Sequence, residues 1–159
     1  MEWTHLEEVL ERYGNEVAEG YKENLQSKDI NASGDLAQSV QYRIERNGSA
    51  YEVSLQLADY WKWIEKGRRP GKMPPLGAIE KWIKVKPVIP KPYNGKLPTE
   101  KQLAFLIGRK IALEGTEARH PLRDTLEDKN QEFLLQIEKA FMEDLEAQVD
   151  EVLVMLNNA

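Results

Sequence analysis

Seven apolar residues of the first 25 positions recur at steps of three and four. They are Trp3, Leu6, Leu10, Tyr13, Val17, Tyr21 and Leu25. On a helix these steps give one apolar stripe opposite an acidic face. Residues 28–35 are then rich in Asn, Ser, Asp and Gly, which compete with the helical backbone or leave it unconstrained. We therefore predict an amphipathic N-terminal helix, followed by a turn that is helical at residues 35–39.

A period of two replaces this pattern between residues 40 and 57. Apolar and polar residues alternate on both sides of Asn47 and Gly48. Asn and Gly tolerate the positive φ angles of a type I′ turn, so the pattern predicts an antiparallel β-hairpin with Asn47 and Gly48 at its centre. A lone hairpin is only marginally stable. Its apolar face is therefore expected to pack on the helices or to join strands of another chain.

The middle of the chain is broken by proline and glycine. We predict short helices over residues 58–66 and 76–83, with Gly67 as a left-handed cap after the first. Three prolines between residues 68 and 75 exclude regular structure there, so a rigid basic loop is expected. Residues 85–98 form an extended arm in the prediction, because prolines interrupt this segment throughout.

Three tryptophans lie in these short helices. Trp61 and Trp63 are two positions apart, which is about 200° on a helix, so both cannot face one core. We expect Trp63 and Trp82 to be buried, and Trp61 to be available to a partner.

The sequence pattern in the last third of the chain predicts two further helices. Thr99 and Gln102 have the spacing of a capping box, so one helix begins at Thr99 and ends at Gly115. The other covers residues 122–157, with a nearly heptad spacing of apolar residues along one face. These residues are Leu134, Ile137, Phe141, Leu145, Val149, Val152 and Leu156. The sequence thus predicts an α+β fold in a single domain over residues 1–159.

Composition excludes several classes of protein. The chain has no cysteine, which removes disulfides, zinc-thiolate sites and thiol nucleophiles. Its apolar runs are too short to span a membrane, and its first residues do not resemble a secretory signal. His5 and His120 stand at no metal-ligand spacing, and no nucleophile elbow or phosphate loop occurs. We expect a soluble protein made in a cytoplasm, with no enzymatic activity, no metal and no cofactor.

Charge is unevenly distributed along the chain. Residues 1–57 carry a net charge of −6, residues 58–110 one of +9, and residues 111–159 one of −8. Two interpretations remain open at this point: the opposite charges meet within one molecule or are solvated, or they meet between subunits.

One segment in the basic region resembles a known family. Residues 66–75 have the pattern Lys-Gly-Arg-x-Pro-Gly-Lys-x-Pro-Pro directly after Tyr-Trp-Lys-Trp-Ile-Glu, and residues 104–112 read Ala-Phe-Leu-Ile-Gly-Arg-Lys-Ile-Ala. This combination resembles the neck and tail-completion proteins of tailed bacteriophages and prophages, over roughly residues 1–127. The chain departs from the family pattern at residues 84–87, which enter a longer proline-rich arm, and at Leu122, where relatives tend to carry an aromatic residue.

The resemblance implies a structural virion protein in the neck or tail. It would form a homo-oligomeric ring and contact other phage structural proteins, namely the portal or adaptor and the tail tube, while DNA passes nearby without specific binding. Acidic helices would then face the lumen. The candidate interface residues are Trp61, Lys66, Arg68, Arg69, Pro70, Lys72, Pro74, Pro75, Lys86, Pro90 and Tyr93.

The main alternative is a nucleic-acid-binding phage adaptor. In that interpretation the basic side chains of residues 62–86 bind phosphates and a tryptophan stacks on a base. A hydrolase is a third interpretation, and the absence of a recognised site argues against it.

Overall fold

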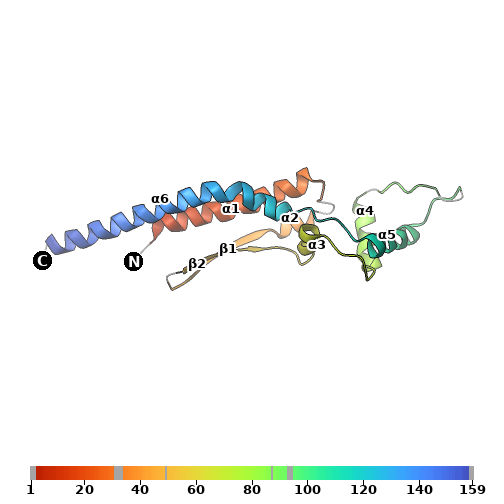
Figure 1. Cartoon of the computed structure of the whole chain (residues 1–159), viewed down its shortest axis with the longest axis horizontal. Coiled ribbons are helices and arrows are strands. Elements are labelled where there is room, and N and C mark those ends of the chain that lie inside the picture. Colours follow the sequence, from red (N-terminus) through yellow and green to blue (C-terminus); the bar gives the residue numbers. More distant parts are fainter. Residues whose placement is uncertain (1–2, 31–33, 49, 87, 93–94, 158–159) are drawn as a thin grey trace. The chain divides into compact units, whose positions relative to one another are not determined.

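The computed structural model describes residues 3–30, 34–48, 50–86, 88–92 and 95–157. The chain groups into two compact units. Unit 1 contains residues 1–24, 40–56 and 122–159, and unit 2 contains residues 25–39 and 57–121. The predicted α+β class is confirmed by the helices and the two-stranded antiparallel sheet (Figure 1).

Two long helices form the body of unit 1. They are α1 (Thr4–Ser27) and α6 (Pro121–Asn157), and both confirm helices expected from the apolar period. The ring of Tyr13 stacks on that of Phe133 with centroids 3.8 Å apart, and Trp3 stacks on Phe141 at 5.2 Å. As residue numbers rise along α1, their partners on α6 fall, so the two helices run antiparallel (Figure 1).

The hairpin completes unit 1. It consists of β1 (Gln41–Asn47) and β2 (Ala50–Gln56), with Tyr42 opposite Leu55 and Ile44 opposite Val53 on the apolar face. Asn47 pairs with Ala50, so Asn47 ends β1 instead of standing at the centre of the turn as predicted. Gly48 alone of the expected pair takes a positive φ, of 65°. The physical reason is that the strand ladder extends one residue further than the turn signal indicates.

Unit 2 is built from short helices. These are α2 (Asp35–Ser39), α3 (Trp61–Lys66), α4 (Leu76–Val85) and α5 (Glu100–Glu114). Ile79 and Ile83 of α4 form a buried cluster with Ala104 of α5. The side chains packed around that cluster are Leu76, Leu103, Ile107 and Ile111.

The start and end of α5 follow the sequence prediction. Thr99 caps the helix, since its side chain accepts a hydrogen bond from the amide of Gln102 while the Gln102 side chain accepts one from the amide of Thr99. Gly115 ends it with a φ of 77°. The arm begins later than predicted, because Val85 is the last residue of α4.

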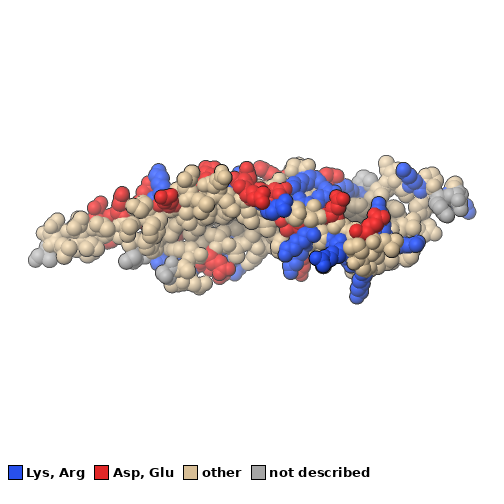
Figure 2. All heavy atoms as spheres, in the orientation of Figure 1, with Lys and Arg blue, Asp and Glu red and all other residues tan. Residues whose placement is uncertain are grey.

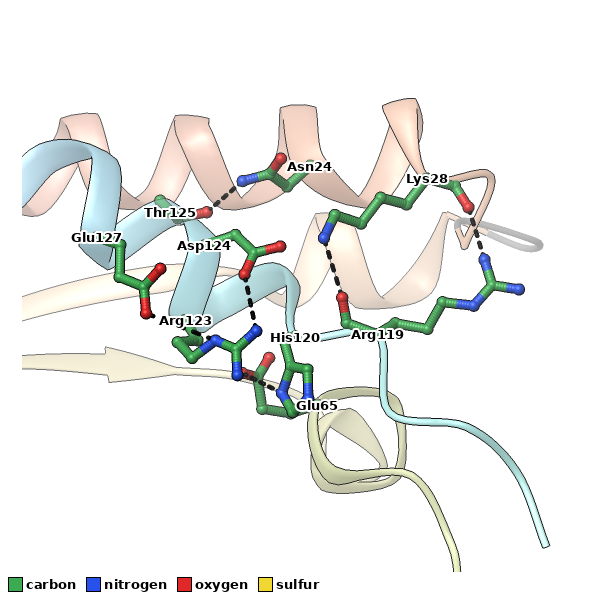
Figure 3. Close-up of polar contacts among 9 residues, drawn as sticks. All are labelled: Asn24, Lys28, Glu65, Arg119, His120, Arg123, Asp124, Thr125 and Glu127. Carbon is green, nitrogen blue, oxygen red and sulfur yellow. Dashed lines mark hydrogen bonds and ion pairs between the residues drawn. The ribbon is translucent and has the colours of Figure 1, made fainter.

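Polar contacts tie distant segments of unit 2 together. The Lys28 Nζ donates to the backbone oxygen of Arg119 at 2.9 Å, and the Arg119 guanidinium donates to the backbone oxygen of Lys28, also at 2.9 Å (Figure 3). Lys86 Nζ donates to the backbone oxygen and to the carboxylate of Asp29. These bonds hold the segment after α1 against the segments that follow α4 and α5.

Candidate protein-interaction surface

The basic loop after α3 is bonded to the backbone that follows α5. The amide of Arg68 donates to the oxygen of Thr116 at 2.9 Å, and the amide of Thr116 donates back to Arg68 at 2.8 Å. Farther along the loop, the amide of Gly71 donates to the oxygen of Ala112 at 2.7 Å. The loop is therefore held in one conformation by backbone hydrogen bonds at two points.

Two glycines allow these backbones to approach. A Cβ at Gly67 would lie 2.4 Å from the oxygen of Thr116, and one at Gly115 would lie 2.1 Å from the oxygen of Arg68. Gly67 has the expected positive φ of 66°, but its ψ of −170° differs from the predicted left-handed cap. The extended ψ directs the chain into the bridge with Thr116, and only glycine adopts this conformation without strain.

The orientation of α3 exposes a tryptophan that the sequence predicts to be buried. Trp63, expected in the core, is 58% exposed, whereas Trp61 is half-buried. The inward face of α3 carries the buried Glu65, whose carboxylate lies 3.8 Å from His120 Nδ1 (Figure 3). With that face inward, Trp63 points to the opposite side of the helix.

The exposed ring of Trp63 is covered on one side by a cation. The guanidinium carbon of Arg68 lies 5.6 Å from the ring centroid, within the range of a cation–π contact. Arg68 also donates a hydrogen bond to the backbone oxygen of Lys72, inside the same loop. Trp63, Arg68 and the loop backbone thus form one preorganised surface, which we call the Trp63 surface.

Trp82 is also more exposed than predicted. It is 40% exposed on α4, because Ile79 and Ile83 occupy the face that packs against α5. The sequence contained a usable signal for this: Ile79 and Ile83 are spaced i, i+4, and Trp82 lies beside their stripe.

The other predicted interface residues have different surroundings. Lys66, Arg69, Pro70, Lys72 and Pro75 are exposed, while Pro74 and Pro90 are partly buried. Lys86 is engaged within unit 2, where its hydrogen bond lowers the pKa of Asp29. Tyr93 lies outside the described residues. The structure thus places the exposed members of the set at the end of α3 and on the loop between α3 and α4.

Basic side chains surround the Trp63 surface. Figure 2 shows blue side chains concentrated over unit 2, whereas the end of α6 carries red and tan. The loop contributes Arg69 and Lys72, and α3 contributes Lys62 and Lys66, all of them exposed.

Within the described ranges, no group of three or more His, Cys, Asp or Glu side chains could hold a metal ion. None of the helices in the described part of the chain combines the length and the apolar character needed to cross a membrane.

Comparison with known proteins gives no match to a family model, to a curated protein or to a solved structure.

Proposed function

We propose that this chain is a structural subunit of a tailed-bacteriophage neck or tail-completion ring, which joins the head or portal to the tail by protein–protein contacts. The observation that carries the proposal is the Trp63 surface. Trp and Arg are enriched among the residues that contribute most to binding energy at interfaces. An indole 58% exposed beside a guanidinium offers both an apolar area and directed hydrogen-bond donors to a partner.

The rigidity of the surface supports the same proposal. The bonds between Arg68 and Thr116 and between Gly71 and Ala112 already order the loop in the free chain. Binding then costs less conformational entropy than it would for an unstructured loop. A preorganised loop with an aromatic anchor suits repeated, identical contacts in an oligomer.

The charge pattern fits an assembly of identical copies. Residues 58–110 carry a net charge of +9 and residues 111–159 carry −8. A basic region of one copy can meet an acidic region of the next, which is a heterologous contact that forms a ring when the rotation closes.

The test is assembly with the proteins encoded by neighbouring genes. The full-length chain is mixed with the portal, adaptor and tail-tube proteins of its own gene cluster, and the mass of the products is measured by native mass spectrometry. We expect a closed oligomer or a portal-bound ring. Trp63→Ala and Arg68→Glu should each reduce the assembled fraction at least tenfold.

The matched control is Phe105→Ala on α5, which removes another exposed aromatic side chain of unit 2. This variant should assemble like the unaltered chain. A chain that remains monomeric with every one of these partners contradicts the proposed function.

A second candidate function is nucleic-acid binding by the same surface. The exposed Trp63, with Lys62, Lys66 and Arg69 nearby in the sequence, offers a stacking ring among cations. Retention on single- or double-stranded DNA at low salt, lost in steps as salt rises, would favour this function. Absence of retention at low salt would exclude it.

A further inference from the structure

Unit 2 contains an apolar groove that no described part of the chain fills. Its volume is about 940 Å³. Its lining includes Leu25 and Leu36, which are buried, and Tyr60, Trp82 and Val85, which are exposed. Exposed apolar walls around a buried apolar lining are typical of a surface that receives side chains from a partner.

Two lysines of α4 also line the groove. Lys81 and Lys84 are spaced i, i+3, so they lie on the same side of the helix. Lys84 pairs with Glu100 at 3.8 Å, while Lys81 makes no ion pair with any described residue. Asp35 is an acidic residue among the lining side chains. The α4 side of the groove is therefore positively charged.

Unit 1 contains an exposed helical segment at the end of α6. Asp144 binds the first turn of α1, and α6 continues beyond it for residues 145–157, about 20 Å of helix (Figure 1). Every residue from 149 to 157 is exposed. We call residues 145–157 the α6 end.

The apolar residues of the α6 end have the spacing of a helix that binds in a groove. Val149, Val152, Leu153 and Leu156 stand at i, i+3, i+4 and i+7, and each is 51% to 68% exposed. At 100° per residue they form one stripe, and Glu146 and Asp150 lie along one edge of it. An apolar stripe with this spacing is the usual way in which an amphipathic helix fills a hydrophobic groove.

We propose that the α6 end of one copy docks in the groove of a second copy, as the contact between neighbouring subunits in the proposed ring. The apolar stripe enters between Trp82 and Val85, and the acidic edge faces Lys81 and Lys84. This inference rests on the proposed ring function, since it names the contact that joins its subunits.

The charges favour docking of the α6 end in the groove over pairing of two α6 ends. The α6 end carries Glu146, Asp150 and Glu151 and no basic residue, so two such ends would repel each other. The basic side of the groove offers the opposite charge, and each copy supplies one groove and one end. Such a heterologous contact can repeat around a ring.

A complementation experiment tests the contact with two full-length variants. One variant, Val152→Glu with Leu156→Glu, has an altered α6 end and an intact groove. The other, Lys81→Glu with Trp82→Ala, has an altered groove and an intact end. Because all four side chains are exposed, both variants should fold, which circular dichroism checks. Sedimentation velocity then measures each variant alone and their equimolar mixture.

We expect each variant alone to be monomeric, and the mixture to form a dimer and nothing larger. In a second pair, Lys81→Glu should weaken association at least tenfold, and Asp150→Lys on the partner chain should restore it. Lys101→Glu, an equal charge change on α5, should have no such effect. A mixture that stays monomeric at the highest attainable concentration overturns the inference, as does association that is insensitive to both groove residues.

The two proposals can fail separately. If the Lys81→Glu, Trp82→Ala chain still forms a ring with the portal or tail proteins, the groove contact is wrong and the proposed function stands. If the unaltered chain joins none of those proteins but its complementary variants dimerise, the contact stands and the phage role is wrong.

Discussion

The carboxylate of Asp144 on α6 binds His5 in the first turn of α1. Oδ1 accepts a hydrogen bond from the backbone amide of His5 at 3.0 Å and lies 2.8 Å from the ring Nδ1, and Oδ2 accepts one from the amide of Leu6 at 2.8 Å. The first amides of a helix have no acceptor within that helix. Asp144 therefore acts as an N-cap supplied by another helix, and it fixes the register of α1 against α6.

Removing this cap should destabilise unit 1. Asp144 is only 4% exposed, and Asp144→Ala leaves the amides of His5 and Leu6 without their acceptor. We expect a loss of about 1–2 kcal/mol in the free energy of unfolding, measured by urea denaturation followed by circular dichroism. The control is Asp150→Ala, an exposed aspartate on the same helix, which should change the free energy by less than about 0.5 kcal/mol. Equal effects of the two substitutions would contradict the capping role.

The same contact predicts how stability depends on pH. Burial acts to raise the pKa of Asp144, but the hydrogen bonds from Leu6 and His5 outweigh it and hold that pKa below 3.8. The hydrogen bond to Asp144 raises the pKa of His5 above 6.5. The contribution of Asp144 to stability is complete above pH 3.8 and is lost as the pH falls through its lowered pKa. The contribution of His5 is complete below pH 6.5 and is lost as the pH rises through its raised pKa.

The measurement is the difference in unfolding free energy between the unaltered chain and Asp144→Asn across pH. The difference in unfolding free energy should be largest between pH 3.8 and pH 6.5 and should shrink on both sides of that range. A difference that does not change with pH would show that the charges of Asp144 and His5 contribute nothing to the contact.

Local signals predicted several elements correctly. These signals depend on neighbours close in the sequence. They are the capping box at Thr99, the alternation in residues 41–47 and 50–56, and the apolar period of α1 and α6. Such interactions are visible in the order of residue types. They define which elements form.

The exposure of Trp63 could not be predicted in the same way. Which face of α3 is buried depends on Arg119 donating to the oxygen of Ile64 and on His120 approaching Glu65, contacts more than 50 residues apart in the sequence. The bond between Asp144 and His5 joins residues 139 positions apart, and no spacing rule relates them. The sequence therefore predicts a buried Trp63, whereas the structure places it on the exposed face of α3.

The glycine at position 67 should be essential to the Trp63 surface. Gly67→Ala would place a Cβ 2.4 Å from the Thr116 oxygen in a conformation with positive φ, so the bridge between Arg68 and Thr116 should break. We expect a loss of about 2–4 kcal/mol in unfolding free energy, with a shift of tryptophan fluorescence as Trp63 loses the Arg68 contact.

Gly77→Ala is the matched control for this substitution. Gly77 lies in α4, and a Cβ there would meet nothing within 4 Å. Alanine is the better helix former, so this variant should be equal to the unaltered chain or more stable by up to about 1 kcal/mol. Similar behaviour of the two variants would mean that the close approach at Gly67 is unimportant.

The packing of the hairpin on α1 can be tested by a double-mutant cycle between Gly14 and Tyr42. A Cβ at Gly14 would lie 2.5 Å from the Tyr42 ring, so Gly14→Ala should cost about 1–2 kcal/mol despite the higher helix propensity of alanine. In a Tyr42→Ala background the ring is absent, and the same substitution should stabilise the chain by up to about 1 kcal/mol. Urea denaturation of the four chains then gives an interaction energy of about 2 kcal/mol.

Tyr51→Ala supplies the comparison for this cycle. Tyr51 lies on the other strand of the hairpin and donates a hydrogen bond to Glu7, two turns of α1 away from Gly14. Because the two residues share no contact, the effects of Gly14→Ala and Tyr51→Ala should add within about 0.5 kcal/mol. If Gly14→Ala changes the unfolding free energy equally with and without the Tyr42 ring, the hairpin does not pack on α1 through this contact. The apolar strand face would then be available to another chain, which is the alternative that the sequence left open.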